Sequence, residues 1–196
     1  MLRKHLPNLM TLTNLALGVL AILLAASADR ILLQKPGKDI SLIYLSCLLI
    51  MAAAIFDRFD GKLARKLNVV SELGKQLDSL SDLISFGVAP AIIAWKLHFS
   101  QTSLFFPVGR VIGFILALSF TIAGAIRLAH YNLQEEPDYY YGIPITLAGS
   151  VLTLMNLLHT YLIVKFHFRS VHVISCMILM AALTILMISK IHLKKI

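Results

Sequence analysis

Six long apolar runs divide this sequence and restrict its fold more than any other feature. They cover residues 9–28, 40–56, 77–97, 105–130, 143–164 and 171–191. A helix needs roughly 20 apolar residues to cross the hydrocarbon core of a bilayer, and the runs are close to that length. Membrane-spanning strands are disfavoured because an open sheet edge leaves backbone groups unpaired in hydrocarbon. The sequence therefore predicts an all-α integral membrane protein with about six transmembrane helices.

The composition favours the same class of protein. Of the 196 residues, 58% are hydrophobic and 14% are charged, and the mean hydropathy is +0.81. So little charge rarely covers the surface of a soluble domain of this length. Six spans with short connections use up the chain, so we expect residues 1–196 to form a single membrane-embedded domain. The first run lacks a convincing small-residue cleavage site, which favours a retained helix over a signal peptide.

The net charge of +8 is distributed between and beside the apolar runs. Topology and anionic lipid headgroups explain basic residues in such positions, so no nucleic acid partner is expected. With six spans, eleven of the 18 Lys and Arg residues fall on the side that holds both termini and the segment between the second and third runs. Because basic residues are enriched on the cytoplasmic side, we expect these parts to face the cytoplasm from a multi-pass position in the cell (cytoplasmic) membrane.

Four of the ten acidic residues lie around the segment that joins the second and third runs, at Asp57, Asp60, Asp78 and Asp82. At about 100° per residue on a helix, Asp57 and Asp60 lie on one stripe. Asp78 and Asp82 are one helical turn apart and also share a face. The sequence therefore predicts two acidic helix faces that can oppose each other. Small or hydroxyl-bearing residues share these faces, with Gly61 and Ala64 on the first and Gly74, Ser81 and Ser85 on the second.

Four carboxylates brought together near a membrane repel one another unless positive charge lies between them. Divalent cations supply that charge, and two ions would balance four aspartates. Oxygen ligands select hard ions such as Mg²⁺, Ca²⁺ or Mn²⁺, and the sequence has no His or Cys cluster that favours zinc. Gly61 and Ala64 leave room for a base or ribose against the helix, and Arg65 can pair with a phosphate oxygen.

The spacing of these residues resembles the signature of the CDP-alcohol phosphotransferase family at every fixed position. It reads Asp57-x2-Asp60-Gly61-x2-Ala64-Arg65-x8-Gly74-x3-Asp78-x3-Asp82. Other parts of the chain resemble the phosphatidylserine synthase branch, namely Pro7, Asn8, Thr11, Asn14 and Gly18, the block 78–90, Arg127-Leu128-Ala129 with Asn132, and Gly142-Ile143-Pro144. Phosphatidylglycerophosphate synthases usually have Lys directly after the last aspartate. Leu83 at that position argues against that branch.

The resemblance implies transfer of the phosphatidyl group from CDP-diacylglycerol to L-serine, which gives phosphatidylserine and CMP. It implies that Asp57, Asp60 and Asp78 hold metal ions, Mg²⁺ or Mn²⁺. It also implies that Asp82 completes the metal site and acts as general base, and that the CDP moiety contacts Gly61, Ala64 and Arg65. A homodimer would also be in keeping with the family.

Polar residues outside the aspartate set complete the predicted site. Asn8, Thr11 and Asn14 either cap the first helix or contact the nucleotide, and both can hold at once. Gly74 belongs to the expected CDP-binding set. From its place at the cytoplasmic end of the fourth run, Arg127 is expected to bind the serine carboxylate or the lipid phosphate, with Asn132 and Ser85 in the same site. The seven histidines are scattered, mostly near the ends of runs, and we interpret them as interfacial anchors.

Two alternative functions stay open at this point. An acceptor such as glycerol 3-phosphate or an inositol phosphate would use the same chemistry, but it would require a basic cluster beyond Arg65 and Arg127. A divalent-cation transporter would distribute acidic residues through several spans at mid-depth. The aspartates gather around one segment instead, which favours the enzyme.

Overall fold

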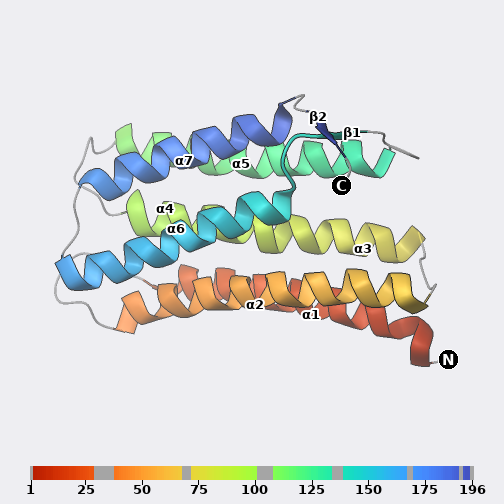
Figure 1. Cartoon of the computed structure of the whole chain (residues 1–196). Helices are drawn as coiled ribbons and strands as arrows, with labels where there is room; N and C mark the ends of the chain where they lie inside the picture. Colours follow the sequence, from red (N-terminus) through yellow and green to blue (C-terminus); the bar gives the residue numbers. More distant parts are fainter. Residues whose placement is uncertain are drawn as a thin grey trace.

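The computed structural model describes residues 2–28, 38–67, 72–100, 108–133, 139–166, 170–189 and 192–194. The side chains of residues 2–7, 38–39, 60–67, 139–141 and 192–194 are outside this description. The helices run side by side as a bundle (Figure 1). They are α1 (Leu2–Ala26), α2 (Lys38–Leu67), α3 (Glu72–Asp82), α4 (Ala89–His98), α5 (Val108–Leu133), α6 (Ile145–Phe166) and α7 (Ser170–Ile188).

Six stretches of described helix are long and apolar enough to cross a membrane, which confirms the predicted all-α, multi-pass architecture. The third of them is a continuous helix from Glu72 to His98, in which a π-helical segment, η1 (Leu83–Val88), joins α3 to α4. Most boundaries lie within a few residues of the predicted ones. However, α2 continues to Leu67, well past the end of its apolar run, because the Leu, Ala, Lys and Arg residues that follow are good helix formers.

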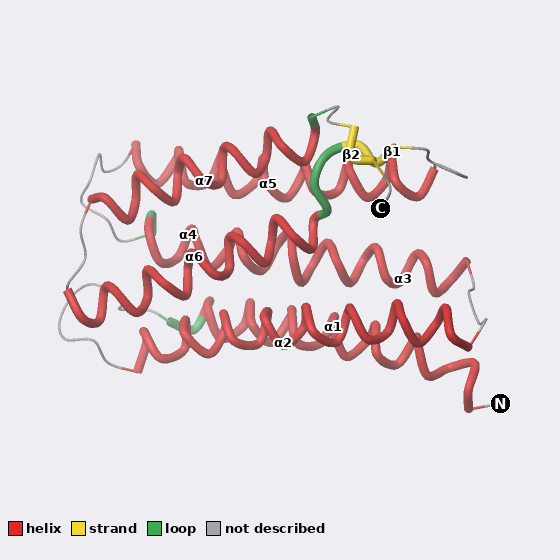
Figure 2. Tube along the Cα trace, in the orientation of Figure 1, coloured by secondary structure: helices red, strands yellow, loops and turns green. Residues whose placement is uncertain are grey.

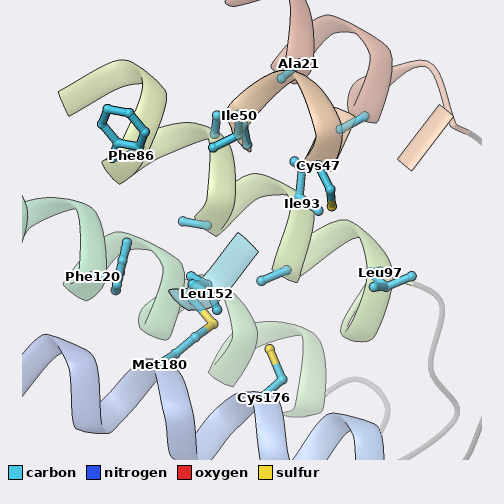
Figure 3. Packing of buried hydrophobic residues seen from close by; sticks show 14 of the residues in the cluster. Ala21, Cys47, Ile50, Phe86, Ile93, Leu97, Phe120, Leu152, Cys176 and Met180 are labelled. Carbon is cyan, nitrogen blue, oxygen red and sulfur yellow. The ribbon is translucent and has the colours of Figure 1, made fainter. Parts of the chain in front are cut away.

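The helix from α3 to α4 lies in the middle of the bundle. It contacts α1 and α2 on one side and α5, α6 and α7 on the other. Buried side chains fill the space around it (Figure 3), including Ile50 of α2, Phe120 of α5, Leu152 of α6 and Met180 of α7. Large apolar side chains such as Ile178 are exposed on the outside of the bundle, as expected of helices whose solvent is lipid.

Both α1 and α3 begin, and α2 ends, at the same end of the bundle, on the right of Figure 1. Two short strands, β1 (Tyr139–Tyr141) and β2 (His192–Lys194), pair antiparallel near this end, with Tyr140 opposite Leu193 (Figure 2). This pairing was not predicted, because three residues are too few to show a strand's alternating pattern. It lies outside the six apolar stretches, so the spans themselves are helical.

Two glycines allow neighbouring helices to approach η1 closely. A Cβ atom at Gly149 of α6 would collide with the backbone oxygen of Phe86, and one at Gly18 of α1 would collide with Ser85. Close approach of this kind is typical of small residues between membrane helices. The segment that directly follows the aspartates is therefore held between α1 and α6.

Candidate active site

Three of the four aspartates converge between α2 and α3. Asp57 comes from α2, Asp78 and Asp82 come from α3, and one carboxylate oxygen of each lies within 4.8 Å of the others. Asp82 is buried, with 8% of its surface exposed, whereas Asp57 and Asp78 are half-buried. The carboxylate of Asp57 on α2 therefore lies opposite those of Asp78 and Asp82 on α3, as the residue spacing predicted.

The donor set of this cluster fits a hard divalent cation. Oxygen atoms bound to one Mg²⁺ at about 2.1 Å lie between about 3 and 4.2 Å apart, so small side-chain movements would bring the three carboxylates onto one ion. Without a cation, three carboxylates at this spacing repel one another in a partly buried site. Asp57, Asp78 and Asp82 can therefore hold a metal ion.

Several predicted site residues belong to the last turns of α2, where the side chains lie outside the described residues. They are the fourth predicted metal ligand, Asp60, and the predicted CDP-binding residues Gly61, Ala64 and Arg65. The described backbone is helical as far as Leu67. The predicted stripe requires a helix through residues 57–64, and the described backbone is helical there.

Helix α1 is joined to the aspartate-bearing helix by two buried hydrogen bonds. The hydroxyl of Ser81 donates to the backbone oxygen of Thr11 at 3.1 Å, and the hydroxyl of Ser85 donates to the backbone oxygen of Asn14 at 3.0 Å. Thr11 is buried and Asn8 is half-buried. The predicted N-terminal residues therefore lie along the helix that carries Asp82.

Asn14 carries a polar group that the described protein leaves without a partner. Its side chain is 0% exposed, and neither its Oδ1 nor its Nδ2 has a hydrogen-bond partner among the described residues. The backbone oxygen of Asn14 accepts the Ser85 hydroxyl, so this amide belongs to a residue that packs against the aspartate-bearing helix. The sequence predicts that Asn14 caps the first helix or contacts the nucleotide, and an amide without a partner among the described residues is compatible with contact to a ligand.

Arg127 of α5 lies close to the carboxylates. Its guanidinium interacts electrostatically with Asp82 and lies 5.6 Å from the ring centroid of Tyr131. The buried Nε of Arg127 has no hydrogen-bond partner among the described residues. The structure thus brings Arg127 to the aspartate cluster with one donor still available, as a ligand-binding role requires.

A hydrogen-bonded network joins the end of α5 to the first turns of α3. Asn132 donates from Nδ2 to the Oγ of Ser79 at 2.8 Å, and Ser79 donates to the backbone oxygen of Lys75 at 3.1 Å. Lys75 in turn donates from Nζ to the backbone oxygen of Asn132 at 3.1 Å. From the sequence, Lys75 is expected to be a topology signal and an anchor at the phosphate surface, without a catalytic role. The amide nitrogen of Asn132 has a partner inside the protein, and its expected role in substrate binding stays a prediction.

The π-helical segment begins directly after Asp82. The backbone N–H of Ala89 donates to the oxygen of Ile84, five residues earlier, which is the hydrogen bond that defines a π-turn. Single π-turns inside α-helices are frequent at functional sites. The π-turn therefore lies next to the buried Asp82 and close to Ser81 and Ser85, the two serines that hydrogen-bond α1.

These features describe a class of protein: a multi-pass helical membrane protein with opposed carboxylates from two of its helices at one end of the bundle. The chain belongs to the CDP-alcohol phosphatidyltransferase family, whose model matches residues 4–189. The family assignment agrees with the aspartate spacing and with the position of those aspartates in the structure.

Several curated proteins are similar to the chain. A CDP-diacylglycerol–serine O-phosphatidyltransferase of Helicobacter pylori is 34% identical over 165 residues, which is 83% of this chain and 60% of that protein. One of Bacillus subtilis is 32% identical over 154 residues, covering 78% of this chain and 76% of the relative. An archaetidylserine synthase of Methanothermobacter thermautotrophicus is 30% identical over 190 residues, 95% of this chain and 68% of the relative.

Proposed function

We propose that this protein transfers the phosphatidyl group from CDP-diacylglycerol to L-serine, giving phosphatidylserine and CMP. The observation that carries this proposal is the convergence of Asp57, Asp78 and Asp82 between two membrane helices of a chain that belongs to this family. Serine is the proposed acceptor because the relatives described above carry serine in their names.

Asp82 is proposed as the general base because it is the most buried of the three carboxylates and interacts electrostatically with Arg127. Its carboxylate takes the proton from the serine hydroxyl, and the serine oxygen then forms a bond to the lipid-linked phosphorus. The bond from that phosphorus to the oxygen of CMP breaks, and CMP leaves. Proton transfer by a positioned carboxylate contributes about 10²- to 10⁴-fold to such a rate.

Asp57, Asp78 and Asp82 would hold a divalent cation, Mg²⁺ or Mn²⁺, and with Asp60 the set would accommodate two ions. A bound cation would neutralise charge on the phosphoryl oxygens of the substrate. For the CDP moiety we propose a set of small, polar and basic residues along α1, α2 and the start of α3: Asn8, Thr11, Gly61, Ala64, Arg65 and Gly74.

Arg127 is proposed to bind the serine carboxylate or the lipid phosphate, because its guanidinium interacts electrostatically with Asp82 and its buried Nε has no hydrogen-bond partner among the described residues. Asn132 and Ser85 are also proposed for the serine or lipid-phosphate site, Asn132 from the α5 side of the aspartate-bearing helix and Ser85 from its α1 side. Asn14 is also proposed to contact the substrate, because its buried amide has both a donor and an acceptor without partners among the described residues and can hydrogen-bond a polar group.

The experiment that tests the proposal is a CMP-release assay with purified protein in detergent. CDP-diacylglycerol, Mg²⁺ or Mn²⁺ and a panel of alcohols are supplied, and serine should react faster than glycerol 3-phosphate or an inositol phosphate. The Asp82→Asn variant should lose at least about 10²-fold in turnover. Equal turnover with glycerol 3-phosphate would rule out serine as the preferred acceptor, and undiminished transfer by Asp82→Asn would rule out the general base.

The role of Arg127 is tested separately with Arg127→Ala. We expect the Michaelis constant for serine or for the lipid to rise, because a guanidinium binds a carboxylate or a phosphate through charge-assisted hydrogen bonds. The exposed Arg110 on α5 provides a control, since Arg110→Ala should leave both constants unchanged. If both constants are unchanged in Arg127→Ala as well, the assignment is wrong.

The cellular setting is also part of the proposal. We infer that the protein lies in the cytoplasmic membrane as one membrane-embedded domain, residues 1–196, with both termini and the aspartates facing the cytoplasm. This agrees with the basic residues flanking α2 and α3 and with the side-by-side start of α1 and end of α2. CDP-lipid could then enter from the bilayer and serine from water. The functional unit is proposed to be a homodimer.

A further inference from the structure

Three histidines that are far apart in the sequence meet inside the bundle, at the end opposite to the aspartates. His98 is the last residue of α4, His159 lies in α6, and His172 lies in the first turn of α7. They are 0%, 4% and 9% exposed, respectively. The ring centroids of His159 and His98 are 4.9 Å apart, as are those of His159 and His172.

Two of these rings present nitrogen atoms to each other. The Nδ1 of His159 is 3.2 Å from the Nε2 of His98. The same distance suits a hydrogen bond between neutral rings and two nitrogen ligands of one tetrahedral zinc ion, since Zn–N bonds of about 2.0–2.1 Å place tetrahedral ligands about 3.4 Å apart. A small movement of the two rings therefore converts the hydrogen-bonded pair into a chelating pair.

The polar atoms around this pair can hold both rings in orientations that suit metal ligands. The buried Nδ1 of His98 and the buried Oδ1 of the neighbouring Asn156 belong to side chains that interact through a hydrogen bond. A hydrogen bond to one ring nitrogen leaves the other nitrogen to bind a metal and is typical of His ligands. The second nitrogen of His159 faces the hydroxyl of Ser175 at 3.4 Å, which can orient that ring.

We propose that His98, His159 and His172 form a second cation site, selective for zinc-like transition metals, that joins α4, α6 and α7. Imidazole nitrogen favours such metals, whereas the carboxylates at the other end of the bundle favour hard ions. His98 and His159 already have ligand spacing, and His172 completes the site by rotation of its side chain at the start of α7. The proposal does not depend on the transferase activity.

The test uses Co²⁺, which gives visible absorption bands when bound in tetrahedral nitrogen sites. Full-length protein carrying Asp57→Asn and Asp82→Asn is purified in detergent and treated with a chelator, so that metal binding at the aspartates is removed. Titration with Co²⁺ should produce visible absorption bands that saturate at one equivalent of Co²⁺. Zn²⁺ should remove these bands by displacing Co²⁺, whereas millimolar Mg²⁺ should not. Zn²⁺ should also raise the melting temperature of this protein.

Single substitutions in the same background identify the ligands. His159→Gln should abolish the visible bands, and His172→Gln should weaken binding at least tenfold. His130→Gln is the matched control, because His130 is exposed on α5 outside the cluster, and it should bind Co²⁺ normally. Gel filtration confirms folding, and if His159→Gln does not fold, His172→Gln decides the result. Absent visible bands in the parent protein, or unchanged bands in His172→Gln, would overturn the proposal.

Discussion

Asn132 donates a 2.8 Å hydrogen bond to the hydroxyl of Ser79, and this contact joins the end of α5 to the first turns of α3. Ser79 directly follows Asp78 in the chain. Lys75 adds a second connection through its bond to the backbone oxygen of Asn132. The helix that provides two of the three converging carboxylates is therefore fixed from the α5 side, just as the serine hydroxyls fix it from the α1 side.

A double-mutant cycle measures the first of these contacts. Asn132→Ala and Ser79→Ala should each lower the free energy of unfolding by about 0.5–1.5 kcal/mol, the usual contribution of one hydrogen bond. The double variant should lose clearly less than the sum of the two. Denaturation in detergent provides the measurement. Strictly additive losses would show that the two side chains do not interact.

Removing the cation should reveal the repulsion among the aspartates. In chelator, Asp78→Asn should melt at a higher temperature than the wild type, because one of three neighbouring negative charges is gone. With Mg²⁺ at about 100 times its dissociation constant, the wild type should gain about 2.7 kcal/mol, and the variant should gain much less.

The control for this experiment is Glu72→Gln, which removes an exposed acid from the first turn of α3, outside the cluster. This variant should respond to Mg²⁺ as the wild type does. If Mg²⁺ stabilised wild type and Asp78→Asn equally, the three carboxylates would not be the site that binds the ion.

The close packing of α6 against η1 predicts unequal effects for two Gly-to-Ala substitutions. A Cβ at Gly149 would meet the backbone of Phe86, which cannot easily move, so Gly149→Ala should destabilise by about 1–3 kcal/mol. A Cβ at Gly87 would meet only the ends of the Leu83 and Ile145 side chains, at 3.1 and 3.3 Å. In thermal denaturation, the melting temperature of Gly149→Ala should therefore be well below that of Gly87→Ala. The reverse order of melting temperatures would contradict the described packing.

The proposed orientation can be tested by thiol labelling of intact cells. Cys47 and Cys176 are both buried, so background labelling should be low. Leu133 is 80% exposed at the aspartate end of α5, and Val171 is 67% exposed at the opposite end of α7. A membrane-impermeant maleimide should label Val171→Cys in intact cells but label Leu133→Cys only after lysis. The opposite pattern would place the aspartates outside the cell.

Helix-scale features of this protein could be predicted from the sequence. The lengths of the apolar runs predicted the membrane helices. Helical periodicity predicted that Asp57 lies on a helix face that can oppose the face of Asp78 and Asp82. These predictions succeeded because they depend on spacing within one or two neighbouring elements. The π-turn after Asp82 has no comparable sequence pattern, since it changes the helix by a single residue.

Contacts between distant helices could not be predicted in this way. His98 and His159 are 61 residues apart, and each looks like an isolated polar residue near the end of an apolar run. The sequence analysis therefore interpreted the histidines as interfacial anchors, whereas the structure buries three of them together. The unpartnered amide of Asn14 is likewise visible only after α1 is packed against the aspartate-bearing helix.

The π segment also has a consequence for how the third membrane helix tolerates change. Each residue in a helix adds about 100° of rotation, so the longer turn between Asp82 and Ala89 gives α4 a different angular setting from α3. The carboxylates can aim at α2 while Ile93 and Leu97 stay oriented for the interior. Deleting one residue from 83–88 would restore a regular α-helix. Either the aspartates would then no longer point toward α2, or Ile93 and Leu97 would no longer point into the interior. The π-turn thus allows the orientation of the aspartates and the packing of α4 to change independently within one continuous helix.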